Sequence, residues 1–548
     1  MAFPQPTQPT HNQTTDTMAT LAQAGGRTYQ AALTHLNLLI PNRTVTALFD
    51  NRPKTKDQDP NLLALPEMRT WLRRAGYDPS DLARLRCIHV AGTKGKGSTC
   101  AYLTSILVAR PDLAGRVGTY TSPHLVTPRE RIALDGRPIA KDLFARYFFE
   151  LWDRLGDAAV AEGTMAREEA AGPASKPFYF RFLTLLAFHV FLSEGVTSVV
   201  VEVGIGGAYD ATNVLPPEAV TAAVITQLGI DHVAMLGDTV EKIAWHKAGV
   251  MKRGVPAFTR LLGRNGNEGG DEEGVMRVLR DRAEELGCSE LVEVRDEEVD
   301  AWGGVQVRGS IKGGSFQSRN QALAALAAEE HLCSLAGTAT SKATRKLAEI
   351  PAWITEAMKK TSLRGRQEVV EDRQRPAVRW LLDGAHTVDS LAETAAWLAM
   401  EMEQGKSMGK NRRYVLLFNQ QEREAGKLLG GFLDKLRNAV GEEDKASSQS
   451  EGRLFDTALF SRNDVTRSDT SQNPDLSVQE SCRETFASRY PETTTTTELC
   501  PDLPTAMDRV ADLASRFRAG GEETVVLVTG SLHLVGGVIG LLEPDGLD

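Results

Sequence analysis

Short apolar runs alternate with segments of helical periodicity along most of the chain. Runs rich in β-branched residues predict buried strands at residues 87–90, 198–203 and 222–226. Apolar positions spaced three or four residues apart predict helices around them, at residues 29–39, 68–85, 100–107, 178–192, 240–250 and 319–336. Because strands that alternate with helices form a parallel sheet covered on both faces, this part predicts an α/β domain. A smaller β section is predicted at residues 292–311.

The same alternation starts again after Leu363. Strands are predicted at residues 378–382, 414–418, 454–460 and 525–529, and helices at 389–402 and 505–519. We therefore place a domain boundary near residue 362. The pattern predicts a large N-terminal parallel-sheet domain over residues 27–362 and a smaller α/β domain over residues 363–548.

Other segments have the composition of tails and loops. Residues 1–26 are rich in Thr, Gln and Pro and lack Arg and Lys, which predicts a disordered polar tail rather than a secretory signal or an Arg-rich presequence. Met18 is an alternative start. Residues 461–497 are rich in Ser, Thr, Asn and Asp and predict a mobile surface insertion, and residues 265–273 predict a second such loop.

Composition narrows the choice of function. A chain of 548 residues exceeds the size that one hydrophobic core usually serves. The formal net charge of -9 at pH 7 argues against general nucleic-acid binding, and no apolar run approaches the roughly 18–20 residues of a membrane span. The six cysteines are scattered without a CxxC pair, which predicts free thiols in a reducing compartment.

The stretch GTKGKGS at residues 92–98 lies between a predicted strand and a predicted helix. Gly92, Gly95 and Gly97 allow the backbone to curl so that several N–H groups point inward at the start of the helix, where the helix dipole also favours an anion. This arrangement predicts a phosphate-binding loop. The alternative is a plain glycine turn with solvated lysines, which the strand–loop–helix context disfavours.

Lys96 is placed to reach the β- and γ-phosphates of a nucleotide, and Ser98 or Thr99 to supply a hydroxyl near its metal ion. The loop departs from the common GxxxxGK[ST] pattern, because the first two glycines are too close and Gly97 separates the lysine from the hydroxyls. The departure is itself informative. GTKGKGS resembles the nucleotide loop of the Mur-type ATP-dependent amide ligases, and specifically that of the folylpolyglutamate synthase branch.

Further stretches support this resemblance, in the same order along the chain and over about residues 28–542. They are TSPHLVTPRERI (121–132), FYFRFLTLLAF (178–188), VEVGIGGAYDATN (201–213), LGIDHVAMLG (228–237), IAWHKAGVMK (243–252), LLDGAHT (381–387) and VTGSLHLVGG (528–537). The resemblance implies a P-loop-type ATPase domain followed by a Rossmann-like α/β domain, with ATP and substrates in the cleft between them. It also implies a monomer in the cytoplasm, with an additional mitochondrial form as a further expectation.

The implied reaction adds L-glutamate to the γ-carboxylate of a folate or folyl(poly)glutamate. A carboxylate is a poor electrophile, so the γ-phosphoryl group of ATP first converts it to an acyl phosphate that an amine can attack. The implied cofactor is Mg²⁺, as two ions, with a monovalent cation such as K⁺ as a further candidate. Dihydrofolate synthase, which adds the first glutamate to dihydropteroate by the same chemistry, is the nearest alternative.

The resemblance implies Ser122, Glu202 and His232 as magnesium ligands, with His232 also among the catalytic residues. Each follows or ends a predicted strand, where an open α/β sheet collects its ligands. Taken singly, Ser122 also fits a turn or cap and His232 an ordinary loop histidine. Glu202 lies between two valines, where a buried carboxylate needs a cation or another partner.

Lys96 and Lys247 are the other implied catalytic residues. In similar ligases the lysine of the KAG sequence reacts with CO₂, and the resulting carbamate binds a second Mg²⁺. We transfer this role to Lys247, which requires a neutral amine before CO₂ can add. Without the resemblance, Lys247 reads as a solvated lysine on the helix predicted at residues 240–250.

For ATP, the resemblance implies contacts from the whole loop, namely Gly92, Thr93, Lys94, Gly95, Lys96, Gly97 and Ser98. Asn320 and Arg366 are implied as further contacts, and Asp383 as the ligand of the ribose. The family more often has Trp-Pro-Gly-Arg where this chain has SLRGR, so the alignment is weakest at Arg366.

Arg131, His386 and Ser531 are the implied glutamate and folate contacts, since an arginine fork matches a carboxylate. Arg131 as a surface charge is the alternative. The folate is expected near residues 121–128 and 178–182, although both stretches also fit ordinary loop and core.

Three other classes of protein compete with this interpretation. A dinucleotide oxidoreductase would use VGIGGAYD, which lacks GxGxxG and a clear following helix. A P-loop GTPase or small kinase has no need of a second domain with DGAHT and GSLH. A non-catalytic binding module leaves Lys96, Glu202 and Lys247 without a role.

Overall fold

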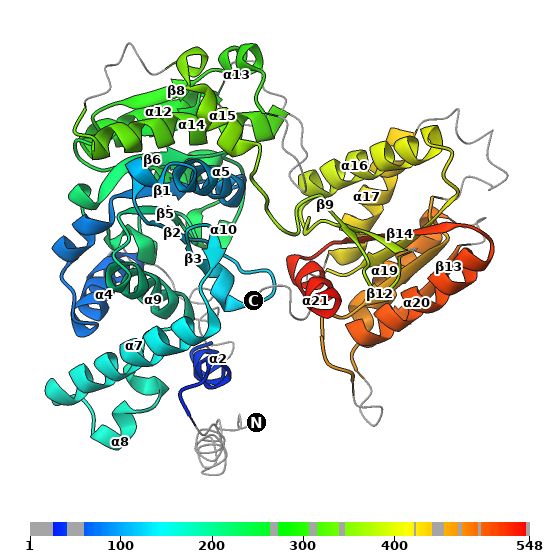
Figure 1. Cartoon of the computed structure of the whole chain (residues 1–548), viewed down its shortest axis with the longest axis horizontal. Coiled ribbons are helices and arrows are strands. Elements are labelled where there is room, and N and C mark those ends of the chain that lie inside the picture. Colours follow the sequence, from blue (N-terminus) through cyan, green and yellow to red (C-terminus); the bar gives the residue numbers. More distant parts are fainter. Residues whose placement is uncertain are drawn as a thin grey trace, which may run out of the picture. The chain divides into compact units, whose positions relative to one another are not determined.

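The structure is a computed structural model that describes residues 26–40, 60–262, 272–305, 315–338, 346–376, 378–420, 424–440, 454–468, 474–490 and 495–543. The chain divides into two compact units (Figure 1). Unit 1 takes the chain up to Pro123, then Arg129–Gly304 and Ser315–Ala357, whereas unit 2 takes His124–Pro128 and the chain from Met358 onward. The predicted tail at residues 1–26 and the predicted loop at 265–273 fall almost wholly outside the described residues.

Unit 1 is built on an eight-stranded sheet with the order β4-β3-β2-β5-β1-β6-β7-β8. The strands from β2 to β8 along this order are parallel, and β3 and β4 add an antiparallel edge. Their bounds are β1 Cys87–Ala91, β2 Val117–Tyr120, β3 Ile132–Leu134, β4 Arg137–Pro138, β5 Ser198–Glu202, β6 Val220–Ile225, β7 Ala257–Arg260 and β8 Leu291–Val294. The central strands β1, β5 and β6 are buried throughout, and apolar residues predominate on both of their faces.

Helices cover both faces of this sheet. One face carries α2, α4, α7 and α9 at one end and α11 and α12 at the other, while α5 and α14 pack against the opposite face. The bounds are α2 Tyr29–Asn37, α4 Pro60–Arg74, α5 Lys96–Val108, α6 Pro111–Ala114, α7 Lys141–Ala161, α8 Arg167–Ala170, α9 Tyr179–Ser193, α10 Val233–Leu236, α11 Val240–Ala248, α12 Glu272–Glu285, α13 Asp296–Trp302, α14 Ser315–Leu335 and α15 Ala352–Met358.

Unit 2 contains a six-stranded sheet with the order β13-β12-β11-β14-β10-β9, parallel except for β9 at one edge. Helices α16, α17 and α19 pack on one face, and α20 and α21 on the other. The bounds are β9 Glu368–Glu371, β10 Val378–Leu382, β11 Arg412–Phe418, β12 Thr457–Ser461, β13 Thr496–Cys500, β14 Glu523–Thr529, α16 Val388–Ser407, α17 Ala425–Val440, α19 Ser477–Arg489, α20 Leu503–Ala519 and α21 Leu532–Leu542. The prediction of two α/β sheets is therefore confirmed.

Two local predictions need correction. Residues 68–85 are not one helix: α4 ends at Arg74, and a separate 3₁₀ segment runs over Pro79–Leu85, because Gly76 adopts a positive φ of 88° that a helix does not tolerate. The β section predicted at residues 292–311 is wrong over its described part, residues 292–305. Within those residues β8 is the only strand, and the acidic run after it starts helix α13, where Asp296, Glu297 and Glu298 favour the helix N-terminus.

The segment 461–497 is not a mobile surface insertion over its described residues. It contains helix α19 and the start of strand β13, which pairs in parallel with β12. Cys482 and Phe486 of α19 are buried in the core that the α16–α17 side of the sheet forms. Composition predicted a mobile segment because the few apolar residues that pack α19 on the sheet stand among many polar ones. Residues 469–473 and 491–494 lie outside the described residues.

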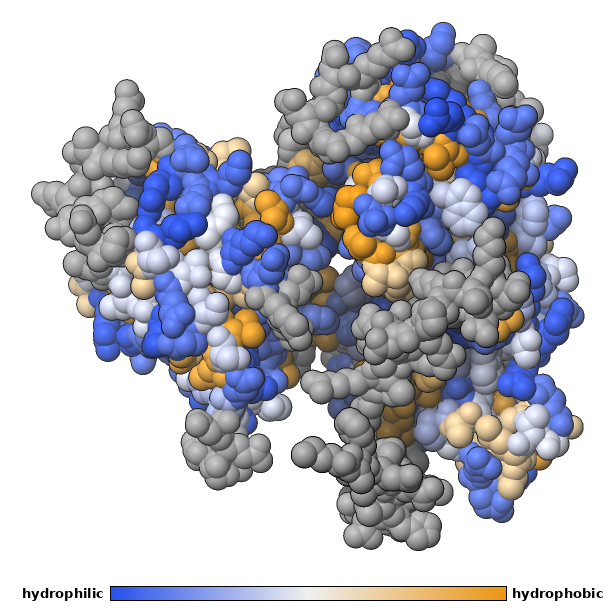
Figure 2. All heavy atoms as spheres, turned by 180° about the vertical axis from the view of Figure 1, so that it is seen from behind, coloured by the Kyte–Doolittle hydropathy of each residue, from blue (hydrophilic) through white to orange (hydrophobic). Residues whose placement is uncertain are grey.

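The surface view in Figure 2 shows mostly hydrophilic side chains with scattered hydrophobic patches on the face it draws. Within the described ranges, no helix is both long enough and apolar enough to cross a membrane.

Candidate active site

The predicted phosphate loop follows β1 directly and opens helix α5. Gly92 and Gly95 have positive φ values of 152° and 84°, and Gly95 is the N-cap of α5 in the left-handed conformation. A Cβ on Gly92 would lie 1.8 Å from Thr226 Oγ1, and one on Gly95 would lie 2.4 Å from Asn320 Oδ1. Both positions therefore require glycine for conformation and for space. The second contact also places Asn320 of α14 beside the loop, where ATP contacts were expected.

The end of strand β6 holds the loop in place. Thr93 N donates to Gln227 O at 2.8 Å, and Thr93 Oγ1 donates to Gly229 O at 3.0 Å. Thr226 Oγ1 donates to Lys94 O at 2.7 Å. The loop is thus a fixed element rather than a flexible turn, as electrostatic stabilisation of a transferring phosphoryl group requires.

Lys96 and Lys247 meet at the same backbone oxygen. Lys96 Nζ donates to Gly92 O at 2.9 Å, and Lys247 Nζ, from α11, donates to Gly92 O at 2.8 Å. Lys247 is only 2% exposed, so it is not a solvated surface lysine. Burial, and next the charge of Lys96, lower the pKa of Lys247 to about 7. A substantial fraction of Lys247 is therefore neutral near neutral pH.

Glu202 and Ser122 form a second polar pair beside the loop. Glu202 ends β5 next to Val90 of β1 and is buried, and a Cβ on Gly97 would lie 3.9 Å from its Oε1. Ser122 follows β2, the neighbour of β5, and its backbone N donates to Glu202 Oε2 at 3.0 Å. The structure thus brings together two of the three predicted metal ligands, both with oxygen donors.

His232, the third predicted ligand, is differently placed. It is the N-cap of α10 in the left-handed conformation, with φ 48°, and its Nε2 lies 3.6 Å from Asp231 Oδ2. Its side chain is 44% exposed, in contrast to Glu202. Among the described residues, no three His, Cys, Asp or Glu side chains are grouped so that they could hold a metal ion.

In unit 2, Asp383 and Arg366 are neighbours. Asp383 follows β10, and its carboxylate accepts from Gln367 N at 2.8 Å and Ala385 N at 2.9 Å. Burial raises the pKa of Asp383, and the Arg366 guanidinium opposes that shift. The two backbone contacts fix the carboxylate at the carboxyl end of the strand, the usual ligand side of a parallel sheet.

His386 and Ser531 also lie at neighbouring strand ends in unit 2. His386 is in the loop after β10 and Ser531 in the loop after β14, and Gly530 N joins these loops by donating to Ala385 O at 3.0 Å. Ser531 is the N-cap of α21, where its Oγ accepts from Leu534 N at 3.4 Å. Arg131 belongs to unit 1, is 8% exposed and lies 5.5 Å from the Tyr179 ring centroid, so it is not a surface charge.

The two stretches expected near the folate differ in their surroundings. Residues 121–128 pass from unit 1 into unit 2, where Leu125 packs so closely on α21 that a Cβ on Gly536 would lie 1.9 Å from Leu125 O. In the other stretch, Phe180 covers the loop after β5, because a Cβ on Gly204 would lie 2.4 Å from its Cζ. Phe182 is core, whereas Phe178 is exposed.

Comparison with known proteins decides the family. No protein-family model matches the chain. Folylpolyglutamate synthase of Neurospora crassa is 40% identical over 549 residues, which cover 97% of this chain and 95% of that protein. A probable folylpolyglutamate synthase of Schizosaccharomyces pombe is 37% identical, covering 94% of each chain. The chain belongs to the folylpolyglutamate synthase family. The resemblance seen in the sequence is confirmed.

Solved structures of folylpolyglutamate synthases have the same fold. The Mycobacterium tuberculosis protein, complexed with ADP and AMPPCP, matches with a TM-score of 0.59 and 23% identity, covering 91% of this chain and 97% of that one. The Thermotoga maritima protein matches with a TM-score of 0.57 and 22% identity, covering 88% and 93%. The α/β architecture inferred from the sequence is therefore that of the folylpolyglutamate synthases.

In this member of the folylpolyglutamate synthase family, several buried polar residues near the predicted site were not predicted from the sequence. Asp210 accepts from Ile205 N and Thr212 N at 3.0 Å each, which fixes the loop after Glu202. Asn419 and Gln420 follow β11 and lie beside the loops that carry His386 and Ser531. The available signal was position, because polar residues directly after a buried parallel strand stand at the ligand edge.

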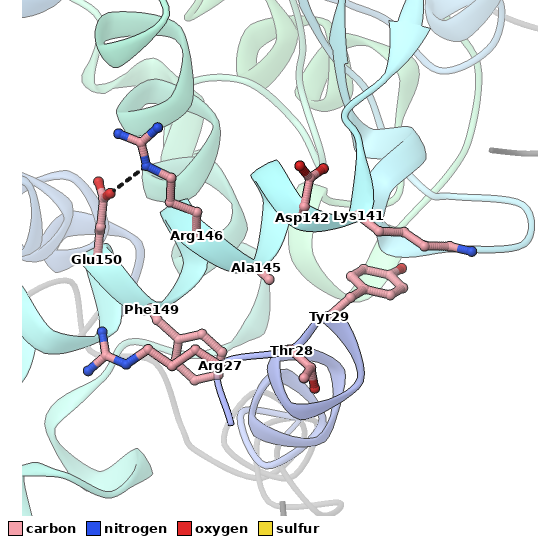
Figure 3. Close-up of a pocket in the computed structure, with 9 residues that line it drawn as sticks. All are labelled: Arg27, Thr28, Tyr29, Lys141, Asp142, Ala145, Arg146, Phe149 and Glu150. Atoms are coloured by element: carbon pink, nitrogen blue, oxygen red, sulfur yellow. Dashed lines mark hydrogen bonds and ion pairs between the residues drawn. The ribbon is translucent and has the colours of Figure 1, made fainter. Parts of the chain in front are cut away.

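A groove of about 630 Å³ lies between α2 and the first half of α7 (Figure 3). Two of its cations are paired: Arg146 Nε is 2.9 Å from Glu150 Oε1, and Arg27 Nη1 is 2.7 Å from Asp153 Oδ2. Arg27 also lies 5.6 Å from the Phe149 ring centroid. The Arg27 contacts join the start of α2 to α7, whereas the Arg146–Glu150 pair lies within α7. None of the predicted folylpolyglutamate synthase site residues lines the groove.

Proposed function

We propose that the chain is an ATP-dependent ligase that adds L-glutamate to the γ-carboxylate of folates and folylpolyglutamates. A γ-carboxylate oxygen attacks the terminal phosphorus of ATP, ADP leaves, and an acyl phosphate remains. The glutamate nitrogen, after losing a proton from its ammonium form, attacks the acyl carbon and phosphate leaves. The observation that carries the proposal is the rigid glycine loop with two lysines on one carbonyl, in a chain of this family.

The loop supports the first step through positive charge and backbone donors. Gly95 caps α5 without a side chain in the way, so the first N–H groups of a long helix face the loop. Lys96 exchanges Gly92 O for a phosphate oxygen with a rotation of its side chain. Phosphoryl transfer depends mainly on such positioning and charge stabilisation.

Lys247 carries the second part of the proposal. Its neutral amine attacks the carbon of CO₂, the nitrogen loses one proton, and a carbamate anion forms. Burial supports this reaction because it favours the neutral amine, and Lys96 supplies a nearby cation for the product. By resemblance to the family, the carbamate would be a ligand of a second Mg²⁺.

Ser122 and Glu202 fit a magnesium ion by their chemistry. A buried carboxylate and a serine hydroxyl are hard oxygen donors, and the Ser122 N–H already fixes the orientation of one carboxylate oxygen. The Thr99 hydroxyl, in the first turn of α5, is buried and has no hydrogen-bond partner among the described residues. When bound, Mg²⁺ would neutralise charge on the phosphates. His232 is proposed as the third ligand on the resemblance alone.

For the substrates, we assign ATP to the loop with Asn320, Arg366 and Asp383, and glutamate and folate to Arg131, His386 and Ser531. The charge of Arg366 acting on Asp383 supports the former, and the joined loops after β10 and β14 support the latter. A cytoplasmic monomer, an additional mitochondrial form and the binding of a monovalent cation such as K⁺ stay predictions.

One assay tests the proposal. The protein is incubated with ATP, Mg²⁺, isotopically labelled glutamate and either tetrahydrofolate monoglutamate or dihydropteroate, and products are weighed by mass spectrometry. The expected products from the folate carry added glutamates, with one ADP released for each. Product from dihydropteroate alone would assign dihydrofolate synthase activity instead, and ADP release without any glutamate product would refute ligation.

A further inference from the structure

At strand β14 of unit 2, the helix that follows the strand packs on a different face of the sheet from the helices that follow the two neighbouring strands. Strand β14 lies between β10 and β11. The helices after β10 and β11, α16 and α17, pack on one face, whereas α21, which follows β14, packs on the other. The loops after these strands therefore diverge at β14. In open α/β sheets, ligands bind in the crevice that such a divergence creates.

Gln420 ties the loop after β11 to the loop after β10. Its Nε2 donates to the backbone oxygen of His386 at 3.2 Å, and the side chain is 5% exposed. The loop after β14 packs closely against the loop after β11, because a Cβ on Gly530 would lie 2.4 Å from Asn419 O. Gln420 is thus a buried donor that fixes the backbone position of a residue on the crevice.

The ring of His386 has a defined protonation pattern in its neutral form. Nδ1 lies 2.9 Å from Gly384 O, and a carbonyl oxygen can only accept, so Nδ1 carries the proton. Nε2 then presents a lone pair. It makes no hydrogen bond within the part of the chain that the structure describes, and the residue is exposed. Such a nitrogen suits an ammonium donor, which is the group that an incoming α-amino acid offers.

We propose that Gln420 is the positioning residue that holds His386 so that Nε2 accepts a hydrogen bond from the ammonium group of the incoming amino acid. This inference rests on the proposed function, since it names the glutamate end of that site. Gln420 acts through His386 and does not itself touch the substrate. Loss of its N–H leaves the partly buried His386 carbonyl without its donor, so the His386 loop shifts while the phosphate loop, in unit 1, is unaffected.

The test is the variant Gln420→Met, which keeps the side-chain length and removes the donor. The KM for L-glutamate is expected to rise about fivefold to tenfold, as the loss of one partly buried hydrogen bond predicts. The KM values for ATP and for the folate should stay within about twofold of wild type, because one hydrogen bond is the only change. Gln404→Met, on the exposed side of α16, is the matched control and should change no KM.

The outcomes separate the two proposals. An unchanged glutamate KM in Gln420→Met, in a wild type that forms product, refutes the positioning role alone. An equal rise in all three KM values together with a lowered Tm also refutes it, because it would show a purely structural role. A wild type that forms no glutamate product refutes the proposed function and this inference with it.

Discussion

Lys96 and Lys247 donate to one backbone oxygen, that of Gly92, from opposite sides of the sheet: Lys96 opens helix α5 and Lys247 belongs to helix α11. Two cations on one acceptor repel each other, and only one of them is largely buried. The buried one, Lys247, therefore yields its proton more readily. The pair links the site that attracts phosphate to the site that is expected to react with CO₂.

Replacing Lys96 should abolish ligation while the fold persists. In Lys96→Ala the loop retains its glycines and backbone donors but loses the cation that reaches the terminal phosphates. We expect kcat for glutamate addition to fall about 100-fold to 1000-fold, the usual cost of one charge-stabilising group. Product formation and thermal unfolding are measured together, with the exposed Lys242→Ala of α11 as control. Activity near the wild-type level would contradict the assignment of the loop.

The titration of Lys247 predicts how stability depends on pH. Its folded-state pKa, about 7, lies below the ordinary lysine value of 10.5, so between these pH values the unfolded chain binds more protons. The cost of burying the ammonium is thus fully present below pH 7 and fades as the pH rises towards 10.5. In CO₂-free buffer at pH 6, the free energy of unfolding of Lys247→Met should exceed that of wild type by on the order of 1–4 kcal/mol. The variant should therefore also unfold at a higher temperature.

The difference in the free energy of unfolding between Lys247→Met and wild type should shrink steadily from pH 7 to pH 9. A constant advantage would contradict the lowered pKa of Lys247. The same titration governs CO₂ addition: ligase activity should fall when bicarbonate is removed, and more so below pH 7, where the ammonium form cannot react. Activity that ignores bicarbonate would refute the carbamate.

The backbone course of the glycine loop could be predicted because its signal is local. Three glycines, a lysine and a following helix lie within a few residues, and the structure shows the curled loop between a strand and a helix, with Gly95 at a positive φ. The contacts made by Asn320 and Lys247 could not be derived this way. They reach the loop from helices far along the chain, and only the sheet order β1-β6-β7 brings those helices near. Gln420 was overlooked for the same reason.

Strands were well predicted where apolar residues predominate, as in β1, β5 and β10. Helix α19 was missed because its dominant signal is polar. Average composition records how many residues are polar, whereas burial depends on where the few apolar ones stand. Cys482 and Phe486 are four residues apart, on one helix face, and that spacing was the available evidence.

The buried position of Phe486 predicts that the segment 461–497 matters for stability. Phe486→Ala should lower the free energy of unfolding by about 3–5 kcal/mol, because a large side chain leaves the core of unit 2. The control is Phe178→Ala, whose ring is 57% exposed and should cost little. Urea unfolding measures both. Deleting residues 477–489 should abolish stable folding of unit 2, and a deletion variant with normal unfolding would show that α19 is dispensable after all.

The variants Gly95→Ala and Gly163→Ala should separate the cost of a strained backbone conformation from the cost of a steric clash. Gly95→Ala must accommodate a φ of 84° and a Cβ 2.4 Å from Asn320 Oδ1, whereas Gly163→Ala meets a φ of 67° with nothing within 4 Å. Strain alone costs about 1–2 kcal/mol, so Gly163→Ala should lose that much stability and keep full activity. Gly95→Ala should lose more stability and raise the KM for ATP more than about tenfold, because its Cβ displaces Asn320 from the loop. Equal stability losses with an unchanged KM for ATP would show that Asn320 moves aside freely and does not help to hold the nucleotide.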